Sequence, residues 1–215
     1  MTRGHTTSTI QEDLRHLMVN AAQMVAIVTT RMPTQLFPDH PFHGATVSSF
    51  ASIALHPHPL VSFSLRLPSR LADAIRRHDD SEMTHPHLVI NLLSSQQATA
   101  ALQFSRPDLF PNPFWSLPMA DQPIRLTKEG VPYLGGSLGS ISCSVVRSLP
   151  LDFSTSSENR DDPLTLQEAK PGDNERYTSE LFLARVVRME KHDDEGEPSR
   201  RLPLVYHQKR FTTVK

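Results

Sequence analysis

The sequence has little of several features that define common functional classes. Its 215 residues include a single cysteine, Cys143, which excludes an internal disulfide and favours a reducing compartment. No apolar run approaches the roughly 20 residues that a membrane-spanning helix needs, and there is no signal-peptide core. The formal charge of -1 leaves no excess of lysine and arginine for a nucleic acid. We therefore expect a soluble protein with neither a membrane nor a nucleic-acid partner.

The motifs of several enzyme classes are also missing. The glycine-dense stretch 135–139 precedes a strand and does not open a helix, so it is not a Rossmann or Walker loop. No Gly-x-Ser-x-Gly motif occurs. The 11 histidines include His56 with His58 and His85 with His87, but each pair flanks a proline and none has the spacing of a helical ligand pair. We expect no metal site, and if the protein is an enzyme, a bound cofactor carries the electron chemistry.

The most informative stretch is Gly44 to Arg70, in which two strand-like runs are joined by the prolines of HPHP. In the second run Val61, Phe63 and Leu65 alternate with Ser62, Ser64 and Arg66, which is the period of a strand with one apolar face. A helix is predicted from Ser69 through residue 77, and its start would point its amide groups toward Arg66. Hydroxyls, an arginine and a helix start suit a planar ligand that carries a phosphate. The alternative is an ordinary hairpin with a wet outer face.

The rest of the chain alternates few helices with more strands. Helices are predicted at 10–18 and 95–104, and strands at 23–31, 87–93, 140–146, 179–190 and 202–211. Asn91 interrupts an apolar strand, so its amide either bonds neighbouring backbone or faces a ligand. The proline-rich segment 107–123 should hold no regular element; its aromatic residues either cover a ligand or form a small satellite cluster. Cys143 is interpreted as a small strand residue and not as a nucleophile.

The absence of a strand-helix-strand rhythm favours a mainly β protein, a largely antiparallel β-barrel with few helices. We expect a partly loose N-terminal segment, 1–17, and one domain over 18–211 that carries a polar insert at 152–178. The cytoplasm is the expected location. Arg3 and the hydroxyls of the first nine residues leave a mitochondrial address as an alternative.

Six blocks of this sequence resemble, in order, the flavin reductase-like family, and the resemblance covers roughly residues 18 to 211. They are GATVSSFASIALHPHPLVSFSLRLPSR, HLVINLLSS, QFSRP, GVPYLGGSLGSISCSVV, ELFLARVVRME and PLVYHQKRF. The resemblance implies an FMN-binding split barrel, antiparallel, six-stranded and of Greek-key type. It also implies a homodimer that holds FMN or FAD near the subunit interface. In such reductases NAD(P)H passes hydride to the flavin N5, and the reduced flavin is used in place or released to a partner monooxygenase.

The resemblance also implies roles for particular residues. Those expected at the ring edge are Thr46, Val47, Ser48 and Ser49, with Ser52 close by; those expected at the phosphate are Arg66, Ser69 and Arg70; those expected on the neighbouring strand and helix are Asn91, Leu92 and Phe104. No catalytic residue is assigned.

Two departures from the family pattern affect nicotinamide binding. Family members that reduce free flavin commonly carry Gly-Asp-His before the strand that begins here at Glu180, where this chain has Thr178 and Ser179. Ala184 and Arg185 stand where Gly-Glu is expected. Three hypotheses therefore stay open: an NAD(P)H-dependent flavin oxidoreductase, a flavin-binding protein without reductase turnover, and an interaction domain with an empty pocket.

Overall fold

The structure is a computed structural model that describes residues 7–33, 40–79, 85–116, 123–151, 179–191 and 201–214. The polar insert expected at 152–178 lies outside the described residues, as do residues 1–6. None of the described helices is long and apolar enough to cross a membrane.

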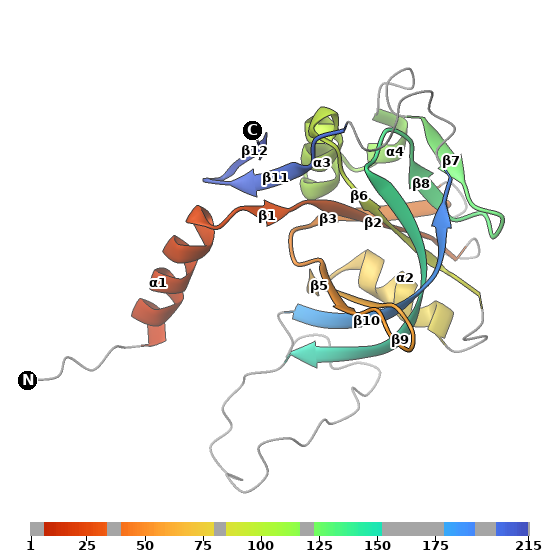
Figure 1. Cartoon of the computed structure of the whole chain (residues 1–215), viewed down its shortest axis with the longest axis horizontal. Helices are drawn as coiled ribbons and strands as arrows, with labels where there is room; N and C mark the ends of the chain where they lie inside the picture. The colour runs from red at the N-terminus through yellow and green to blue at the C-terminus, as the bar shows by residue number, and fades with distance from the viewer. Residues whose placement is uncertain are drawn as a thin grey trace, which may run out of the picture.

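Seven antiparallel strands form the central sheet, in the order β3-β2-β6-β9-β10-β5-β4 (Figure 1). Their bounds are β2 (Ala26–Arg31), β3 (Phe42–Val47), β4 (Ala51–Ala54), β5 (Leu60–Arg66), β6 (Leu88–Leu92), β9 (Gly139–Leu151) and β10 (Ser179–Glu190). Every pairing between neighbours in this sheet is antiparallel. The predicted class, mainly β with antiparallel sheets, is confirmed.

The first strand-like run of the sequence, 44–55, was expected to form a single strand, but it does not. It divides into β3 and β4, which occupy opposite edges of the sheet and are joined by residues 48–50 alone. So short a connection spans only about 10 Å, so the two edges must approach each other and the sheet must curl. This division also gives the sheet seven strands in place of the six that the resemblance implied. Phe50 still packs against the main core, but farther along the run Ile53 is 54% exposed and Leu55 is 71% exposed.

Two small sheets flank the central one. β1 (Gln23–Met24), β11 (Leu204–His207) and β12 (Arg210–Thr213) form one, and β7 (Ile124–Leu126) pairs with β8 (Pro132–Leu134) in the other. The single strand predicted at 202–211 is instead a hairpin, because Gln208 and Lys209 adopt φ of 48° and 60° and reverse the chain between β11 and β12. Such positive φ values at both central residues are typical of tight hairpin turns.

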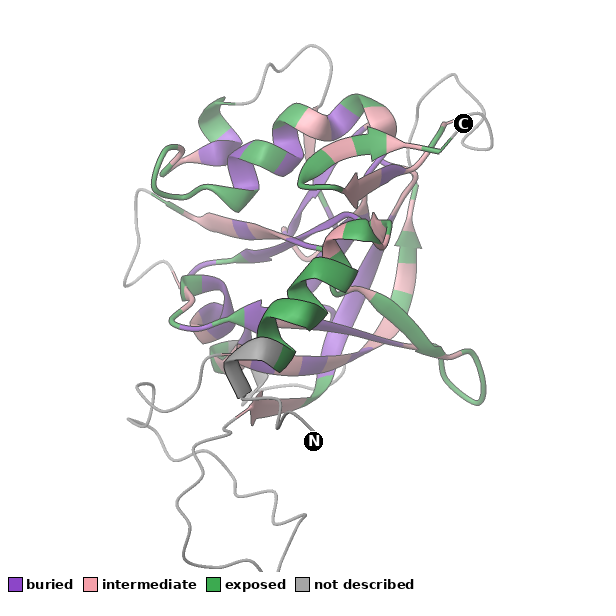
Figure 2. Ribbon diagram, turned by 90° about the vertical axis from the view of Figure 1, so that its left-hand side faces the viewer, coloured by how far each residue is buried: buried purple, intermediate pink, exposed green. Residues whose placement is uncertain are grey.

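The helices are α1 (Thr7–Asn20), α2 (Arg70–Asp79), α3 (Ala98–Ser105), which follows the 3₁₀ turn η1 (Ser95–Gln97), and α4 (Pro113–Ser116). The three predicted helices are therefore present. The proline-rich segment does contain a short helix, α4, because Pro113 occupies a first helical position, where its missing amide hydrogen is not needed. Helix α1 projects from the sheet, and its Ile10, Leu14 and Leu17 are exposed (Figures 1 and 2).

The main core lies inside the curled sheet and under α2. The predicted apolar face of β5, Val61, Phe63 and Leu65, is buried there, and the Phe63 ring stacks on Phe182 of β10 with centroids 5.2 Å apart. Full burial of each such large side chain stabilises the fold by about 1.5–3 kcal/mol. A second cluster, containing Phe104 and Phe114, packs outside the sheet against β2 and η1–α3. The aromatic residues of segment 107–123 were expected either to form a small satellite cluster or to cover a ligand. Phe114 joins this second cluster, whereas Trp115 is 65% exposed.

Asn91 is fully buried and ties four strands together. Its Oδ1 accepts hydrogen bonds from the Leu134 amide at 2.9 Å and the Ser140 hydroxyl at 2.8 Å, and its Nδ2 donates to the Ile27 carbonyl at 3.0 Å. The structural alternative for this asparagine is therefore the one observed. Each of these polar groups would lose its partner if the amide were removed.

Helix α2 is held against the sheet by packing and by charge. Leu71, Ala72 and Ile75 are buried in the main core. Arg76 donates to Glu180 of β10, whose side chain is 0% exposed, and also to Asp73. Burial raises the pKa of the Glu180 carboxyl above its ordinary value, and the nearby Arg76 opposes that rise. The cation is therefore needed only while the carboxyl is ionised.

Replacing Asn91 by leucine should destabilise the protein by about 3 kcal/mol, because the Leu134 amide and the Ser140 hydroxyl would be buried without partners. Urea unfolding of the two proteins measures this difference. Asn20→Ala, which removes an exposed asparagine of α1, is the matched control and should change stability by less than about 0.5 kcal/mol. Equal effects of the two substitutions would contradict the network's role.

Replacing Arg76 by alanine should lower the free energy of unfolding by about 3 kcal/mol at neutral pH, because it leaves the Glu180 carboxylate buried and unpaired. Without Arg76 the pKa of Glu180 rises further, so the carboxyl is protonated at mildly acidic pH and the deficit shrinks as pH falls. Urea unfolding at both pH values tests this dependence, with the exposed Arg77→Ala as control. A deficit that does not change with pH would show that Arg76 acts by packing alone.

Candidate functional site

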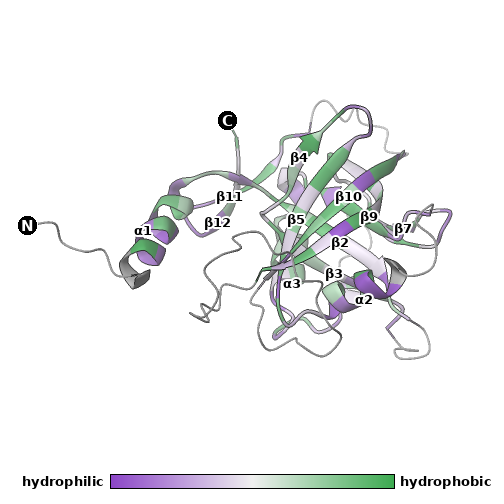
Figure 3. Cartoon of the chain, turned by 90° about the horizontal axis from the view of Figure 1, so that it is seen from below, coloured by the Kyte–Doolittle hydropathy of each residue, from purple (hydrophilic) through white to green (hydrophobic). Residues whose placement is uncertain are grey.

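A hollow of about 760 Å³ opens where β3, the end of β5, the start of α2 and the end of α3 meet. These elements lie side by side (Figure 3), and the size is that of a small-molecule pocket. Eight of the residues expected at a flavin line it: Thr46, Val47, Ser48, Ser49, Arg66, Ser69, Arg70 and Phe104. They come together because the residues 48–50 connection brings the two edges of the sheet close to each other.

Three of the expected residues do not line the hollow. Ser52 is exposed on β4, beyond the point where the chain passes to the other edge of the sheet. The Asn91 amide is engaged with strands inside the protein. Leu92 packs against the main core. The family pattern gave their place in the sequence, but β6 contributes no residue to the lining of the hollow, and the division of 44–55 places Ser52 on β4.

One end of the hollow is cationic. Arg66 ends β5 and Arg70 begins α2, both are exposed, and no carboxylate among the described residues pairs with either. Ser69 caps α2: its Oγ accepts from the Ala72 amide at 3.2 Å and its carbonyl accepts from the Asp73 amide at 3.0 Å. The amides of Arg70 and Leu71 have no acceptor within the helix. Two guanidinium groups beside free amides at a helix start form a site for a phosphate.

The hydroxyls beside β3 mostly shape the wall. Thr46 Oγ1 donates its proton to the Ala101 carbonyl of α3 at 2.7 Å. Ser49 Oγ donates to the Ser64 carbonyl at 3.2 Å and accepts from the Ser64 amide at 2.9 Å, which fastens the β3–β4 connection to β5. These two hydroxyls therefore retain only acceptor capacity toward a ligand. Ser48, which is exposed, has no hydrogen-bond partner within the described parts of the chain and can donate.

Phe104 forms the apolar side of the hollow, where the family pattern placed it. The ring is 3% exposed and meets Phe114 edge-on, with centroids 4.9 Å apart. It lies against Gly44 of β3, where an added Cβ would stand 2.9 Å from a ring carbon. A glycine at this position therefore allows the close approach of α3 to the sheet.

Sequence reasoning missed His43, Ser64 and Ser179, which also line the hollow. Ser64 shares the parity of Arg66 on β5 and could have been found from that alternation. His43 lies just before the block that carries the resemblance. Burial and the nearby charge of Arg70 lower the pKa of His43 to about 4, so its imidazole is neutral at physiological pH.

Other candidate chemistry is not brought together. Within the described ranges no three His, Cys, Asp or Glu side chains lie close enough to hold a metal ion. Cys143 is buried in β9, and burial raises the pKa of its thiol. It is a strand residue of the core, as predicted, and not a nucleophile.

Comparison with solved structures shows the same fold at low sequence identity. A flavin reductase-like protein of Haemophilus somnus 129PT, described as a putative flavin reductase, is 17% identical with a TM-score of 0.65 and covers 94% of this chain and 98% of its own. Nitrilotriacetate monooxygenase component B of Mycobacterium thermoresistibile is 21% identical with a TM-score of 0.65 and coverages of 98% and 89%. An NADH:FAD oxidoreductase of Streptomyces globisporus C-1027 is 17% identical with a TM-score of 0.63 and coverages of 100% and 94%.

The sequence match is broader than any single motif. The model of the flavin reductase like domain matches residues 18–215, which include every residue that lines the hollow. The match begins at residue 18, which is where the resemblance was expected to begin. This chain therefore belongs to the flavin reductase-like domain family.

Proposed function

We propose that this protein is a flavin reductase that holds FMN or FAD in the hollow and transfers hydride to it from NAD(P)H. The observation that carries the proposal is the cationic end of the hollow, where Arg66, Arg70 and the start of α2 meet beside an apolar wall. Membership of the flavin reductase-like family supports the flavin as the ligand.

The residues present fit a flavin. Arg66, Arg70 and the free amides at the start of α2 would hold its phosphate, and the backbone of residues 46–49 would border the edge of its ring. Phe104 supplies an apolar side chain at the wall. When bound, the flavin supplies an N5 atom that accepts hydride from the nicotinamide. The protein's contribution is to bind and orient both reactants.

Two features of assembly belong to the same proposal. We expect a homodimer, because apolar side chains are exposed on the β4–β5 hairpin (Ile53 and Leu55) and on β9 and β10 (Val146 and Val187), and an exposed apolar patch commonly marks a protein interface. We also expect a partner monooxygenase that uses the reduced flavin. One structural relative is named as a monooxygenase component, which supports this expectation by analogy of fold.

A second candidate is a flavin-binding protein that does not turn over NAD(P)H. Ser179 lines the hollow opposite Arg66 in the β10–β5 ladder, at the position where family members commonly carry the histidine of Gly-Asp-His. The loss of that imidazole favours flavin retention without nicotinamide binding. An interaction domain with an empty pocket is a third candidate.

Replacing Arg66 by alanine should weaken FMN binding about tenfold or more, because a charge-assisted hydrogen bond to phosphate would be lost. Riboflavin, which lacks the phosphate, should bind both proteins equally. Calorimetric titration measures the affinities, and Arg210→Ala, which changes an exposed arginine of β12, is the control. Thermal unfolding should be unchanged, since Arg66 is exposed. An equal loss of riboflavin and FMN affinity would refute the phosphate role.

Purified protein supplied with FMN and NADH or NADPH should consume the nicotinamide, which is followed by its absorbance. Flavin binding without consumption would select the second candidate. The absence of any flavin uptake, with no thermal shift on adding FMN or FAD, would reject both flavin hypotheses and select the third.

Light scattering of the purified protein should give the mass of two chains. Replacing both Ile53 and Leu55 by aspartate should give single chains, because charge would replace exposed apolar side chains at the contact. The matched control is Leu109→Asp, which changes an exposed leucine elsewhere on the surface. A single-chain mass for the unmodified protein would overturn the dimer.

A further inference from the structure

A second space, of about 480 Å³, lies beside the turn that joins β4 to β5. We call it the hairpin pocket; residues 56–58 and 60 of the hairpin, 144–146 of β9 and Arg185 of β10 line it. None of these residues lines the hollow. The two spaces adjoin opposite ends of β5, Leu60 and Arg66, which stand about 20 Å apart along an extended strand. The proposed flavin chemistry therefore assigns no role to the hairpin pocket.

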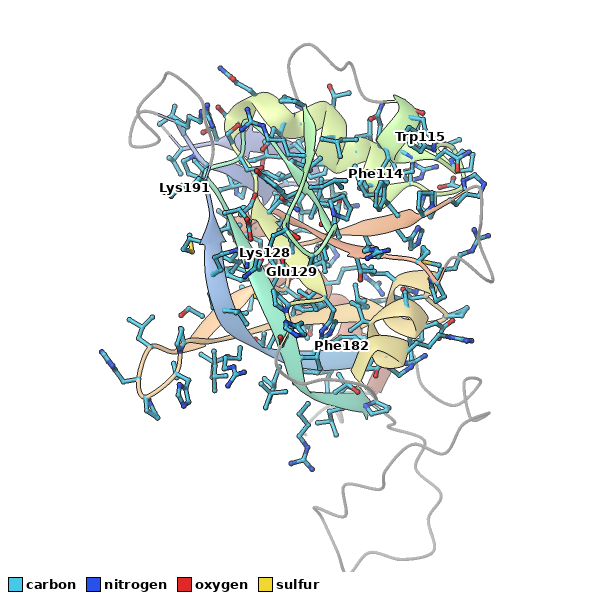
Figure 4. All side chains as sticks on the ribbon, turned by 90° about the vertical axis from the view of Figure 1, so that its right-hand side faces the viewer. Phe114, Trp115, Lys128, Glu129, Phe182 and Lys191 are labelled. Carbon is cyan, nitrogen blue, oxygen red and sulfur yellow. The ribbon has the colours of Figure 1, made fainter. Side chains whose placement is uncertain are left out.

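Hydrogen bonds of the backbone hold the turn beside β10. The carbonyl of Pro59 accepts a hydrogen bond from the amide of Val186 at 2.9 Å. Leu60 stands opposite Arg185 in the ladder of β5 and β10, and Arg185 stands opposite Ser144 of β9. Figure 4 shows the orange β4–β5 turn at the lower left, projecting beyond the blue ribbon of β10. The pocket is thus built on one rung of three neighbouring strands.

Two irregularities in the pairing of β9 with β10 shape this rung. The register skips Val146 of β9 and Val187 of β10, and Arg185 lies between these two interruptions. Neighbouring residues of a regular strand point to opposite faces, yet residues 144–146 all line one pocket. Bulges redirect side chains in this way and are common next to functional sites.

The aliphatic part of the lining has room for a two-ring molecule. It consists of Pro57, Leu60, the buried Val145 and the exposed Val146. A cavity of about 150 Å³ holds benzene, so the hairpin pocket can receive a larger apolar body together with a polar group. Val146 also belongs to the apolar surface proposed above for the homodimer, so the pocket lies at the edge of that surface.

The ionisable groups that line the pocket are all bases. Arg185 comes from β10, and His56 and His58 come from the turn, where both are exposed. No aspartate or glutamate within the described ranges lines the pocket. A guanidinium has five N–H donors, so it can bond a carboxylate and still keep a contact within the protein. Even a neutral imidazole has one N–H to donate. These groups suit an anion.

Arg185 is also one of the two departures from the family pattern. It stands where Gly-Glu would place a carboxylate, so the charge at this position is reversed in this chain. The other departure, at Ser179, lines the hollow, whereas Arg185 lines the hairpin pocket. The structure thus separates the two departures, and the reversed charge belongs to the second space.

We propose that the hairpin pocket binds a small organic carboxylate, with the apolar body against the valines of β9 and the carboxylate on Arg185. The aliphatic walls disfavour a free phosphate ion, which would lose hydration without filling the pocket. The inference goes beyond flavin binding and does not depend on it, because the two spaces share no lining residue.

The test uses naphthoate, which joins a two-ring body to a carboxylate, and its neutral counterpart naphthamide. Calorimetric titration should show saturable binding of naphthoate and about tenfold or more weaker binding of naphthamide, which cannot form the charge-assisted bond. Arg185→Gln should weaken naphthoate binding about tenfold and leave naphthamide binding unchanged. Arg147→Gln, which changes an exposed arginine of β9 that does not line the pocket, is the matched control.

Further measurements distinguish the hairpin pocket from the cationic end of the hollow. Neither Arg66→Ala nor saturating FMN should change the affinity for naphthoate, and inorganic phosphate should not displace it. His58→Ala, which removes an exposed donor of the turn, should also weaken naphthoate binding. Thermal unfolding of each variant should match that of the unmodified protein, and His58→Ala tests the site if Arg185→Gln does not fold.

The absence of saturable naphthoate binding would overturn the inference, as would equal affinities for naphthoate and naphthamide. Displacement by phosphate, or loss of binding in Arg66→Ala, would also overturn it, because the carboxylate would then occupy the hollow. Failure to bind flavin would overturn the proposed function and leave this inference standing.

Discussion

The connection at residues 48–50 is the constraint on which the candidate site depends. It joins β3 on one edge of the seven-stranded sheet to β4 on the other, and its length forces the sheet to curl until those edges approach. Ser49 then bonds both backbone groups of Ser64 on β5, which fixes the two edges relative to each other. The hollow lies beside this junction. Its shape is therefore a consequence of topology, and the hydroxyls of Thr46 and Ser49 already bond neighbouring elements of the protein.

The cationic end depends on a second attachment, that of α2. Leu71 and Ile75 bury one face of the helix in the main core, and Arg76 binds the buried Glu180 of β10. These contacts hold the helix start, with its free amides and Arg70, next to Arg66 at the end of β5. Because the two arginines have no carboxylate partner in the described parts of the chain, their charge is available to a ligand.

Much of the site could be predicted because it is encoded in short stretches. The alternation of β5 correctly predicted Phe63 in the core and Ser64 and Arg66 on the other face. Ser69, a residue type that caps helices, predicted the start of α2. The three expected residues that do not line the hollow lie elsewhere for tertiary reasons. A polar residue in an apolar strand, such as Asn91, can either bond neighbouring groups of the protein or face a ligand. Only the positions of Leu134 and Ser140, which the sequence does not give, distinguish these alternatives. Ser52 lies on β4, at the opposite edge of the sheet from β3, because the chain breaks between the two strands, and alternation does not reveal that break.

By itself the sequence determined three of the helices, most of the strands, the antiparallel class and the family, because periodicity, capping residues and ordered blocks are local properties of the chain. It also determined which residues could hold a phosphate. Only the tertiary structure decided which of them share one hollow, and that the hydroxyls of Thr46 and Ser49 donate their protons to backbone carbonyls of the protein. Those outcomes depend on how distant segments pack against one another, and packing of this kind leaves no periodic signal in the chain.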